Sequence, residues 1–378
     1  MRVLIFLNYY LPGYKGGGPI KTIANLVSTT SDTAEYCIVT KDRDLGSKRP
    51  YPDIVSNSWV DQGNASVFYC SSGFFGFIRG WMQLIFGDYD IIYLNSFFSP
   101  FFSFVPLLLA TVKNYKVVLG PRGEFSSGAL SFKSKKKAVF IRFFKFLKLQ
   151  KRIVFQASSE FEANDIRNIF GEDVDIFLAG DIGRLEKSVS IAEKSNGSIS
   201  LVFVSRVSPM KNLDFALESL KKVMGRVDFD IYGPLEDLAY WQRCLDIISS
   251  LPDNIKAEYR GELHPSEVLP VISQYDLFFL PTKGENYGHV IAEALCAGLP
   301  VIISDQTPWR DLEALGVGWD LPLGSDARFA DVIEEALSMT TEEYAAFRER
   351  VLAWAKEKFE YPEAIEANKA MFDYALKK

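Results

Sequence analysis

The sequence is poor in the residues that build metal centres and disulfide frameworks. Only two histidines occur, His264 and His289, so a site with several histidine ligands is not expected. The four cysteines lie far apart and form no C-x-x-C pair. That spacing favours reduced thiols in a cytoplasm over a zinc site or a disulfide scaffold.

The usual nucleotide fingerprints are absent as well. There is no G-x-G-x-x-G motif and no G-x-x-x-x-G-K-[ST] loop, which argues against a dinucleotide enzyme and a P-loop nucleotidase. Residues 11–27 do contain three consecutive glycines, and Gly17 and Gly18 stand directly before Pro19. Because proline is suited to the first helical turn, these glycine amides can approach an anion at a helix start. The alternative is a flexible surface loop.

No charge occurs between Ile91 and Val112, a length that could span a bilayer. Prolines, an asparagine and three serines interrupt the run, so we expect a strand and then a buried helix capped near Ser99 and Pro100. The apolar run at the N-terminus is too short for a signal peptide and predicts a buried first strand.

Acidic residues are scarce in the first half. Residues 1–180 carry 21 Lys and Arg against 15 Asp and Glu, a net +6, while the remainder carries 21 against 33, a net −12. Residues 131–152 contain nine Lys or Arg, no acid and interleaved aromatic side chains. This pattern predicts an interfacial helix on an anionic membrane. A solvated helix with a buried aromatic face is the alternative, and nucleic acid ranks below the membrane because no recognition motif occurs. The cations expected to face the membrane are Lys133, Lys135, Lys136, Lys137, Arg142, Lys145 and Lys148.

Short apolar runs rich in Val, Ile and Phe alternate with helix-length segments along the chain. Such runs predict parallel strands covered on both faces, and hence doubly wound α/β folding. We expect two Rossmann-like domains facing a cleft, over 1–181 and 182–361, with 180–198 as the linker. The runs are 3–7, 36–40, 66–70, 90–94, 116–120, 153–157, 175–179, 201–205, 229–233, 255–261, 276–281 and 300–304.

Two basic residues follow the strand expected at 201–205. Arg206 and Lys211 stand where that strand gives way to a helix, a place that suits a diphosphate. The alternative is a solvated basic turn.

A second candidate loop follows the strand expected at 276–281. Glu285 lies before a helix expected to begin near Gly288 and to end by Gly298, and Glu293 lies inside that helix. The helix should bury Val290, Ile291, Ala294 and Leu295. The two carboxylates could accept hydrogen bonds from sugar or ribose hydroxyls. The alternatives are helix-dipole stabilisation for Glu285 and an exposed helix position for Glu293.

A third loop follows the strand expected at 116–120. Arg122 and Glu124 could reach an acceptor from the first domain, and the alternative is an exposed ion pair in a turn. Ser159 and Glu162 have capping-box spacing, which predicts helix initiation.

Together, residues 205–220, residues 259–309 and the loop PGYKGGGPI resemble the retaining glycosyltransferases of family 4, which have the GT-B fold. The resemblance implies that Glu285 contacts the donor sugar near the reacting carbon and that Glu293 holds the ribose. Arg206 and Lys211 would bind the diphosphate, Gly17 and Gly18 would close over it, and Asn286, Tyr287 and Gly288 would present backbone amides.

The resemblance further implies retention of anomeric configuration and catalysis without a metal or cofactor. It also implies a C-terminal helix, over about 362–378, that crosses back onto the first domain. Many relatives carry a histidine where this chain has Arg122, so that histidine's role does not transfer.

These observations predict a cytoplasmic enzyme, peripheral on the inner membrane face, that moves a sugar from a nucleotide-diphosphate sugar to a lipid-linked glycan. Polysaccharide assembly such as O-antigen, capsule or exopolysaccharide biosynthesis would use such a step. The alternatives are a phosphorylase or a nucleotide-sugar epimerase of the same fold, and a non-catalytic sugar-binding protein.

Overall fold

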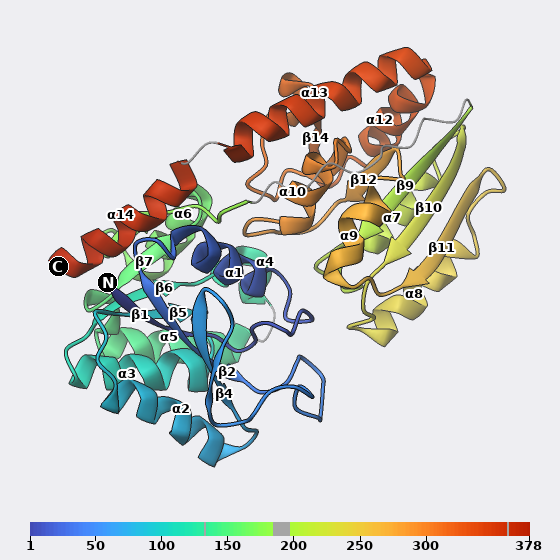
Figure 1. Cartoon of the computed structure of the whole chain (residues 1–378). Coiled ribbons are helices and arrows are strands. Elements are labelled where there is room, and N and C mark those ends of the chain that lie inside the picture. The colour runs from blue at the N-terminus through green and yellow to red at the C-terminus, as the bar shows by residue number, and fades with distance from the viewer. Residues whose placement is uncertain (132–133, 184–196, 361–362) are drawn as a thin grey trace. The chain divides into compact units, whose positions relative to one another are not determined.

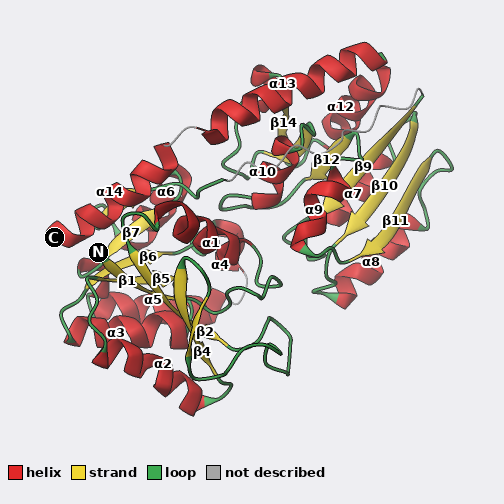
Figure 2. Ribbon diagram, viewed as in Figure 1, coloured by secondary structure: helices red, strands yellow, loops and turns green. Residues whose placement is uncertain are grey.

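The computed structural model describes residues 1–131, 134–183, 197–360 and 363–378 and divides the chain into two compact units (Figure 1). The first unit comprises Met1–Ile182 and Pro362–Lys378, and the second comprises Gly183–Tyr361. Each unit is a mainly parallel sheet between helices (Figure 2), so the predicted α/β fold class with two Rossmann-like domains is confirmed. Most of the linker expected at 180–198 lies outside the described residues.

The first sheet has the strand order β3-β4-β2-β1-β5-β6-β7-β8. All of its neighbours pair in parallel except β3 with β4. Its central strands are almost entirely buried because helices cover both faces. The strands are β1 (Arg2–Phe6), β2 (Glu35–Lys41), β3 (Trp59–Asp61), β4 (Ala65–Cys70), β5 (Ile91–Asn95), β6 (Lys116–Gly120), β7 (Val154–Ala157) and β8 (Ile176–Leu178).

Two hydrophobic cores flank this sheet. Helices α1 (Gly18–Thr30) and α14 (Glu363–Lys377) pack on one face, and α14 contacts β5, β6 and β8. The other face is covered by α2 (Phe74–Phe86), the π-helix η1 (Pro100–Phe104), α3 (Val105–Val112), α5 (Ser134–Phe146) and α6 (Glu160–Phe170). The short segments α4 (Ser127–Ser131) and η2 (Leu149–Lys151) flank α5.

The charge-free run at 91–112 is β5 followed by η1 and α3. The Ser99 hydroxyl accepts a hydrogen bond from the Phe102 amide at 3.2 Å, so the predicted cap is confirmed. Within the described part of the chain, no helix has the length and hydropathy needed to cross a membrane.

The second sheet is parallel throughout, in the order β11-β10-β9-β12-β13-β14. Its strands are β9 (Ser198–Val204), β10 (Arg226–Tyr232), β11 (Ile255–Gly261), β12 (Leu277–Leu280), β13 (Val301–Ser304) and β14 (Gly318–Leu321).

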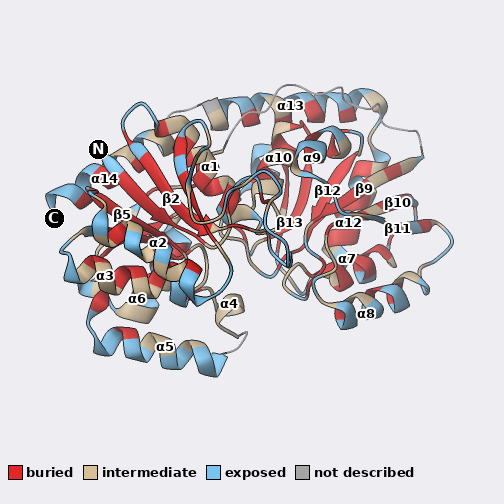
Figure 3. Ribbon diagram, turned by 60° about the horizontal axis from the view of Figure 1, so that its bottom comes forward, coloured by how far each residue is buried: buried red, intermediate tan, exposed pale blue. Residues whose placement is uncertain are grey.

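Two groups of helices lie on either side of the strands in Figure 3, and in each group one helix contacts the other two. One group is α7 (Leu213–Leu220), α8 (Leu238–Ile248) and α12 (Asp326–Ser338). The other is α9 (Pro265–Ile272), α10 (His289–Cys296) and α13 (Thr341–Glu360), and α11 (Leu312–Leu315) precedes β14.

The sequence analysis did not predict two of the strands, β3 and β14. The edge strand β3 is three residues long, half exposed and antiparallel to its neighbour. The strand β14 opens on Gly318 and has one half-buried aspartate among its four residues. Neither has the continuous apolar run that marks a buried strand.

Candidate functional site

The two candidate loops of the second unit meet at the point where its strand order reverses. The strand β9 pairs with β10 on one side and with β12 on the other. The chain leaves β9 toward Arg206 and Lys211 and leaves β12 toward Glu285. In open parallel sheets, ligands bind outside the carboxyl ends of the strands at this reversal.

Hydrogen bonds tie the two loops together. The Asn212 side-chain amide donates to the Pro281 carbonyl at 3.0 Å, and the Lys283 amide donates to the Met210 carbonyl at 2.8 Å. The Thr282 hydroxyl also donates to the Met210 carbonyl, at 3.2 Å. Asn212 precedes α7 in a left-handed conformation with φ 60°, and its hydrogen bond to Pro281 fixes the spacing of the loops. The expectation from sequence missed this role of Asn212, although an asparagine before a helix was the available signal.

Lys211 and Glu285 form an ion pair across the two loops. Both side chains are mostly enclosed, with 12% and 14% of their surfaces exposed. The structure thus brings together a cation predicted to bind a diphosphate and a carboxylate predicted to contact a sugar. A pair held away from most solvent attracts more strongly than a surface pair.

Arg206 is held differently. Its guanidinium contacts the Glu236 carboxylate at 3.0 Å, and both side chains are about half exposed. An exposed pair of this kind contributes little to stability and is readily exchanged for another anion.

The start of α10 offers backbone donors beside this pair. Gly288 is the N-cap residue, with φ 79°, and α10 has no acidic residue in its first turn. The amide groups of a helix start carry partial positive charge and attract anions. The Trp309 indole donates to the Tyr287 carbonyl, and the Tyr287 ring lies 5.3 Å from the Trp309 ring. The Glu285 amide donates to the Gln306 carbonyl at 3.1 Å, so the loop after β13 holds this turn.

The helix itself runs from His289 to Cys296, as expected from its glycine boundaries. Its buried residues are Ile291, Ala292, Ala294 and Leu295, whereas Val290 is half-buried, so the expected stripe was wrong at Val290. Glu293 is half-buried on α10, and Asn286 is half-buried in the turn that follows Glu285.

The glycine loop of the first unit leads directly into α1. Gly17 is the N-cap residue with φ 74°, and no side chain caps the helix. A Cβ atom at Gly17 would meet nothing within 4 Å, while one at Gly16 would lie 3.1 Å from the Tyr9 Cβ atom. Gly18 and Pro19 form the first turn, which contains no acid.

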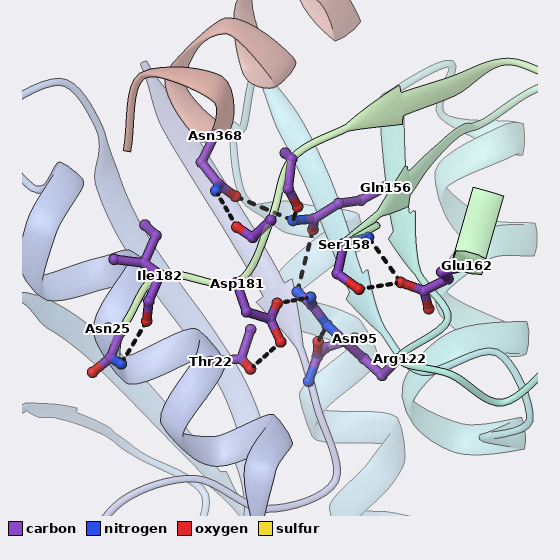
Figure 4. A network of polar contacts seen from close by, with 12 residues as sticks. Thr22, Asn25, Asn95, Arg122, Gln156, Ser158, Glu162, Asp181, Ile182 and Asn368 are labelled. Atoms are coloured by element: carbon purple, nitrogen blue, oxygen red, sulfur yellow. Dashed lines mark hydrogen bonds and ion pairs between the residues drawn. The ribbon is translucent and has the colours of Figure 1, made fainter. Parts of the chain in front are cut away.

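Arg122 and Glu124 do not form the exposed ion pair that was one of the two expectations. The Arg122 side chain is 6% exposed and its guanidinium contacts Asp181 at 2.5 Å (Figure 4). It also donates to Asn95 at 2.7 Å and contacts the Tyr93 hydroxyl. Arg122 therefore holds the carboxyl ends of the central strands and the segment at Asp181 together.

The Glu124 carboxylate instead anchors the turn after β5. It accepts hydrogen bonds from the Phe97 and Phe98 amides at 2.5 and 3.0 Å and from the Ser96 hydroxyl at 2.7 Å. Burial raises the pKa of Glu124, and these hydrogen bonds oppose the rise.

Glu162 has a larger role than helix initiation. Ser159 caps α6 as expected, by accepting a hydrogen bond from the Glu162 amide at 3.3 Å. The Glu162 carboxylate accepts from the Ser158 amide at 2.8 Å and from the Gly123 amide at 2.6 Å. Burial raises its pKa, which the Ser158 and Gly123 amides oppose. Close to these contacts, the Gln156 side-chain amide donates to Asn368, 212 residues away in the sequence, at 3.1 Å, and its oxygen accepts from Arg122 at 3.2 Å (Figure 4). No local sequence motif signals such long-range pairing.

Helix α5 presents most of its cations to solvent, as its largely exposed surface in Figure 3 shows. Lys137 is an exception, because its ammonium donates to the Ala129 carbonyl at 2.6 Å and lies over the Phe98 ring. Lys133 lies outside the described residues. The exposed cations are Lys135, Lys136, Arg142, Lys145 and Lys148.

Large apolar side chains are exposed beside these cations. On α5 they include Phe143 and Phe146, and Phe146 is 79% exposed. Helix α2 exposes Phe75 and Phe86 by 81% and 79%, and neither α2 nor α5 contains an acidic residue. The ring centres of Phe104 in η1 and Phe143 in α5 lie 5.9 Å apart. This contact connects α5 to the segment that leads into α3. We name the exposed surfaces of α2 and α5 the basic-aromatic face.

Across residues 1–131, 134–183, 197–360 and 363–378, no group of three or more His, Cys, Asp or Glu side chains is arranged to hold a metal ion.

The two Rossmann-like units define the class of fold. The fold is that of the GT-B glycosyltransferases. Residues 186–354 match the model of the family "Glycosyl transferases group 1". That stretch contains Arg206, Lys211, Glu285 and Glu293.

Known proteins resemble the chain at low sequence identity. An uncharacterized 41.2 kDa protein in the cps region of Klebsiella pneumoniae is 25% identical over 240 residues, which are 59% of this chain and 62% of that protein. The matches to two other curated relatives cover 26% and 39% of the length of those proteins. The chain therefore spans less than two thirds of each of the three relatives.

Among solved structures, Anabaena HepE in complex with UDP-glucose superposes with a TM-score of 0.70 at 16% identity, covering 100% of this chain and 99% of that one. WaaG, a glycosyltransferase involved in lipopolysaccharide biosynthesis, gives 0.68 at 12% identity, with 98% and 99% covered.

Proposed function

We propose that the chain transfers a sugar from a nucleotide-diphosphate sugar to a glycan acceptor. The observation that carries this proposal is the Lys211–Glu285 pair at the β9/β12 reversal, inside the stretch that matches the group 1 glycosyl transferase model. A cation and a carboxylate side by side suit a substrate that joins a diphosphate to a sugar. HepE, which has the same fold, was crystallised with UDP-glucose.

In this proposal the donor is bound largely by the second unit. Lys211 and Arg206 neutralise the diphosphate, and the amides from Asn286 to Gly288 bind a phosphate or sugar oxygen. Glu285 accepts a hydrogen bond from the sugar, and Glu293 accepts from the ribose hydroxyls.

The chemical step needs stabilisation of the leaving diphosphate. Fixed cations and a helix start that point at developing charge lower the barrier without reorganising in the transition state. We propose that Lys211, Arg206 and the α10 start supply this stabilisation without a metal ion, and that the anomeric configuration is retained.

The proposed acceptor is a lipid-linked glycan of a surface polysaccharide. A relative from a cps region and the fold of an enzyme of lipopolysaccharide biosynthesis support this setting. The basic-aromatic face fits peripheral docking on the inner face of the membrane, where each basic residue near an anionic surface contributes about 1 kcal/mol.

The donor is tested by a thermal-shift screen of UDP-, GDP- and ADP-sugars, because a ligand that binds only the folded state raises the melting temperature. One nucleotide should stabilise the protein, and Glu285→Ala should abolish transfer of the labelled sugar while the protein stays folded. Normal turnover in Glu285→Ala would refute the assignment of Glu285. NMR of the product identifies the anomer, and an inverted product would refute retention. Free sugar phosphate or an epimerised donor as the product would favour the two alternative reactions.

Membrane docking is tested by binding to vesicles that contain phosphatidylserine. Replacing Lys135, Lys136 and Arg142 by glutamine should weaken binding at least about tenfold, since three surface cations are lost. The matched control replaces three exposed lysines of the second unit, Lys222, Lys256 and Lys358, and should leave binding unchanged. Equal binding by the two triple variants would refute docking through the basic-aromatic face.

A further inference from the structure

One lysine of the first unit lies at the carboxyl edge of the sheet and pairs with no carboxylate in the part of the chain that the structure describes. Lys41 ends β2, the neighbour of β1, and its ammonium donates to the Tyr9 hydroxyl at 3.2 Å. The ammonium also lies 4.4 Å from the centre of the Tyr9 ring and 5.8 Å from that of Phe102. Tyr9 belongs to the loop after β1 and Phe102 to the π-helix after β5. Residues at or after the carboxyl ends of three neighbouring strands, β2, β1 and β5, thus meet at the Lys41 ammonium.

The carboxylates that follow Lys41 in the sequence, Asp42 and Asp44, have other partners. Asp42 pairs with Arg43 at 2.8 Å and accepts from the Ser56 hydroxyl at 2.7 Å. Asp44 accepts from the Tyr14 amide at 2.9 Å. Among the described residues no carboxylate lies within ion-pair distance of Lys41, although its side chain is half-buried. A half-buried ammonium is unfavourable unless it is compensated, and contact with two aromatic rings compensates it only in part.

The groups around Lys41 can serve a ligand. Because the Tyr9 hydroxyl accepts from Lys41, its own proton remains available to donate to a ligand oxygen. Asn8, which precedes Tyr9, is half-buried, and its side-chain oxygen accepts from the Ser99 hydroxyl at 3.2 Å. Its side-chain amide donates to none of the described residues and can therefore serve a ligand. The arrangement also lies next to the β1/β5 pair, where the strand order of the first sheet reverses.

We infer that Lys41, Tyr9 and Asn8 form a subsite for an anionic group of the acceptor, a phosphate or a carboxylate. Lys41 supplies the opposite charge, Tyr9 donates a hydrogen bond to the anion, and the Asn8 amide binds an adjacent hydroxyl. A neutral acceptor would leave the ammonium uncompensated as the ligand excluded water, so the subsite selects for charge. The identity of the ligand as the acceptor rests on the proposed function.

The test uses three small probes with the same alkyl tail: hexyl phosphate, hexyl β-D-glucuronide and hexyl β-D-glucoside. Dissociation constants are measured by ligand-observed NMR on the full chain in a Lys211→Met background, which removes a donor-site cation. Lys41→Met and Lys41→Arg are compared with Lys116→Met. Lys116 is an exposed lysine at the start of β6, at the opposite edge of the same sheet.

At least one anionic probe should bind about tenfold more tightly than the glucoside. Lys41→Met should abolish this difference, while Lys41→Arg and Lys116→Met should preserve it. Preference for the phosphate indicates a phosphorylated or diphosphate-linked acceptor, and preference for the glucuronide indicates an acidic sugar. Equal binding of all three probes, or an unchanged preference in Lys41→Met, would overturn the subsite.

The outcome is separable from that of the proposed function. The nucleotide-sugar screen reports on the second unit, and the probes report on the first. If no nucleotide sugar stabilises the protein, the proposed transfer fails, while the charge preference at Lys41 stands or falls by itself. If transfer occurs, Lys41→Met should raise KM for an anionic acceptor with little change in kcat.

Discussion

At the scale of single residues, the contact with most consequence is the ion pair between Lys211 and Glu285. Each side chain neutralises the other while no donor is bound. A diphosphate that uses Lys211 must therefore compete with Glu285 for the ammonium. The pair makes the free site nearly neutral and holds both side chains in place at the carboxyl edge of the sheet.

Glu285→Gln should consequently bind nucleoside diphosphate more tightly while it loses transfer. A surface ion pair contributes up to about 1 kcal/mol, so removing this more enclosed competing pair should lower the dissociation constant at least about fivefold. Isothermal titration with the nucleotide found in the screen measures the effect. Glu236→Gln, which frees the exposed Arg206, serves as the comparison and should change affinity less. Weaker nucleotide binding in Glu285→Gln would contradict this competition.

Cysteine reactivity gives a second prediction at the residue scale. Burial raises the pKa of the Cys70 and Cys244 thiols to about 12, and that of Cys37 is raised as well. Because the thiolate is the reactive form, a maleimide at neutral pH should label only Cys296, which is half-buried at the end of α10. Mass spectrometry should find one label on the native protein and four in denaturant. Rapid labelling of Cys70 in the native protein would contradict its burial.

Arg122 illustrates what sequence reasoning could not provide. Its position after a predicted strand was correct, yet its partners Asp181 and Asn95 lie 59 and 27 residues away in the sequence. An arginine after a strand has the same local pattern whether it faces solvent or a buried aspartate. The Lys211–Glu285 contact, 74 residues apart, was foreseeable only as a shared edge of the sheet.

At the scale of elements, the turn into α10 places the candidate site. Gly288 has φ 79°, and a Cβ atom there would lie 2.8 Å from the Ile291 Cδ1 atom. Gly284 belongs to the same loop, and its nearest neighbour would be 4.0 Å away. Two glycines four residues apart thus have opposite tolerance for a side chain.

Gly288→Ala should lower the free energy of unfolding by about 1–2 kcal/mol, since a side chain in the left-handed region is strained. Gly284→Ala should change it by less than about 0.5 kcal/mol. Urea denaturation measures both variants. Equal effects of the two substitutions would show that Gly288 is not conformationally required.

The strands show which elements a sequence determines well. Buried parallel strands such as β5 and β12 appear as continuous apolar runs because both of their faces are covered. The edge strand β3 and the short β14 lack that run and were missed. Helix α10 was placed correctly because glycines bound it on both sides.

At the scale of the whole molecule, the chain returns to its first unit after building the second. Helix α14 contributes Met371, Phe372 and Ala375 to the core beside β1 and β5. The Phe372 ring lies 6.4 Å from that of Tyr36 and 6.1 Å from that of Tyr93. The first unit thus depends on side chains from the C-terminal end of the sequence.

Phe372→Ala should destabilise the first unit by about 3–5 kcal/mol, as expected for truncating a buried aromatic side chain. Hydrogen exchange measured by mass spectrometry should accelerate in peptides from β1 and β5 and stay unchanged in those from β9 and β12. Phe86→Ala is the matched control, because that phenylalanine is 79% exposed. Faster exchange in both units would contradict a destabilisation that is confined to the first unit.

The return of α14 also has a consequence for synthesis on the ribosome. Domains generally fold as they emerge, N-terminal first. Here the part of the first sheet that α14 covers stays uncovered until residues 363–377 have left the exit tunnel. By then the complete second unit has been released. The domain translated first is therefore completed last, and a premature stop before α14 would deprive the first unit, and not the second, of part of its core.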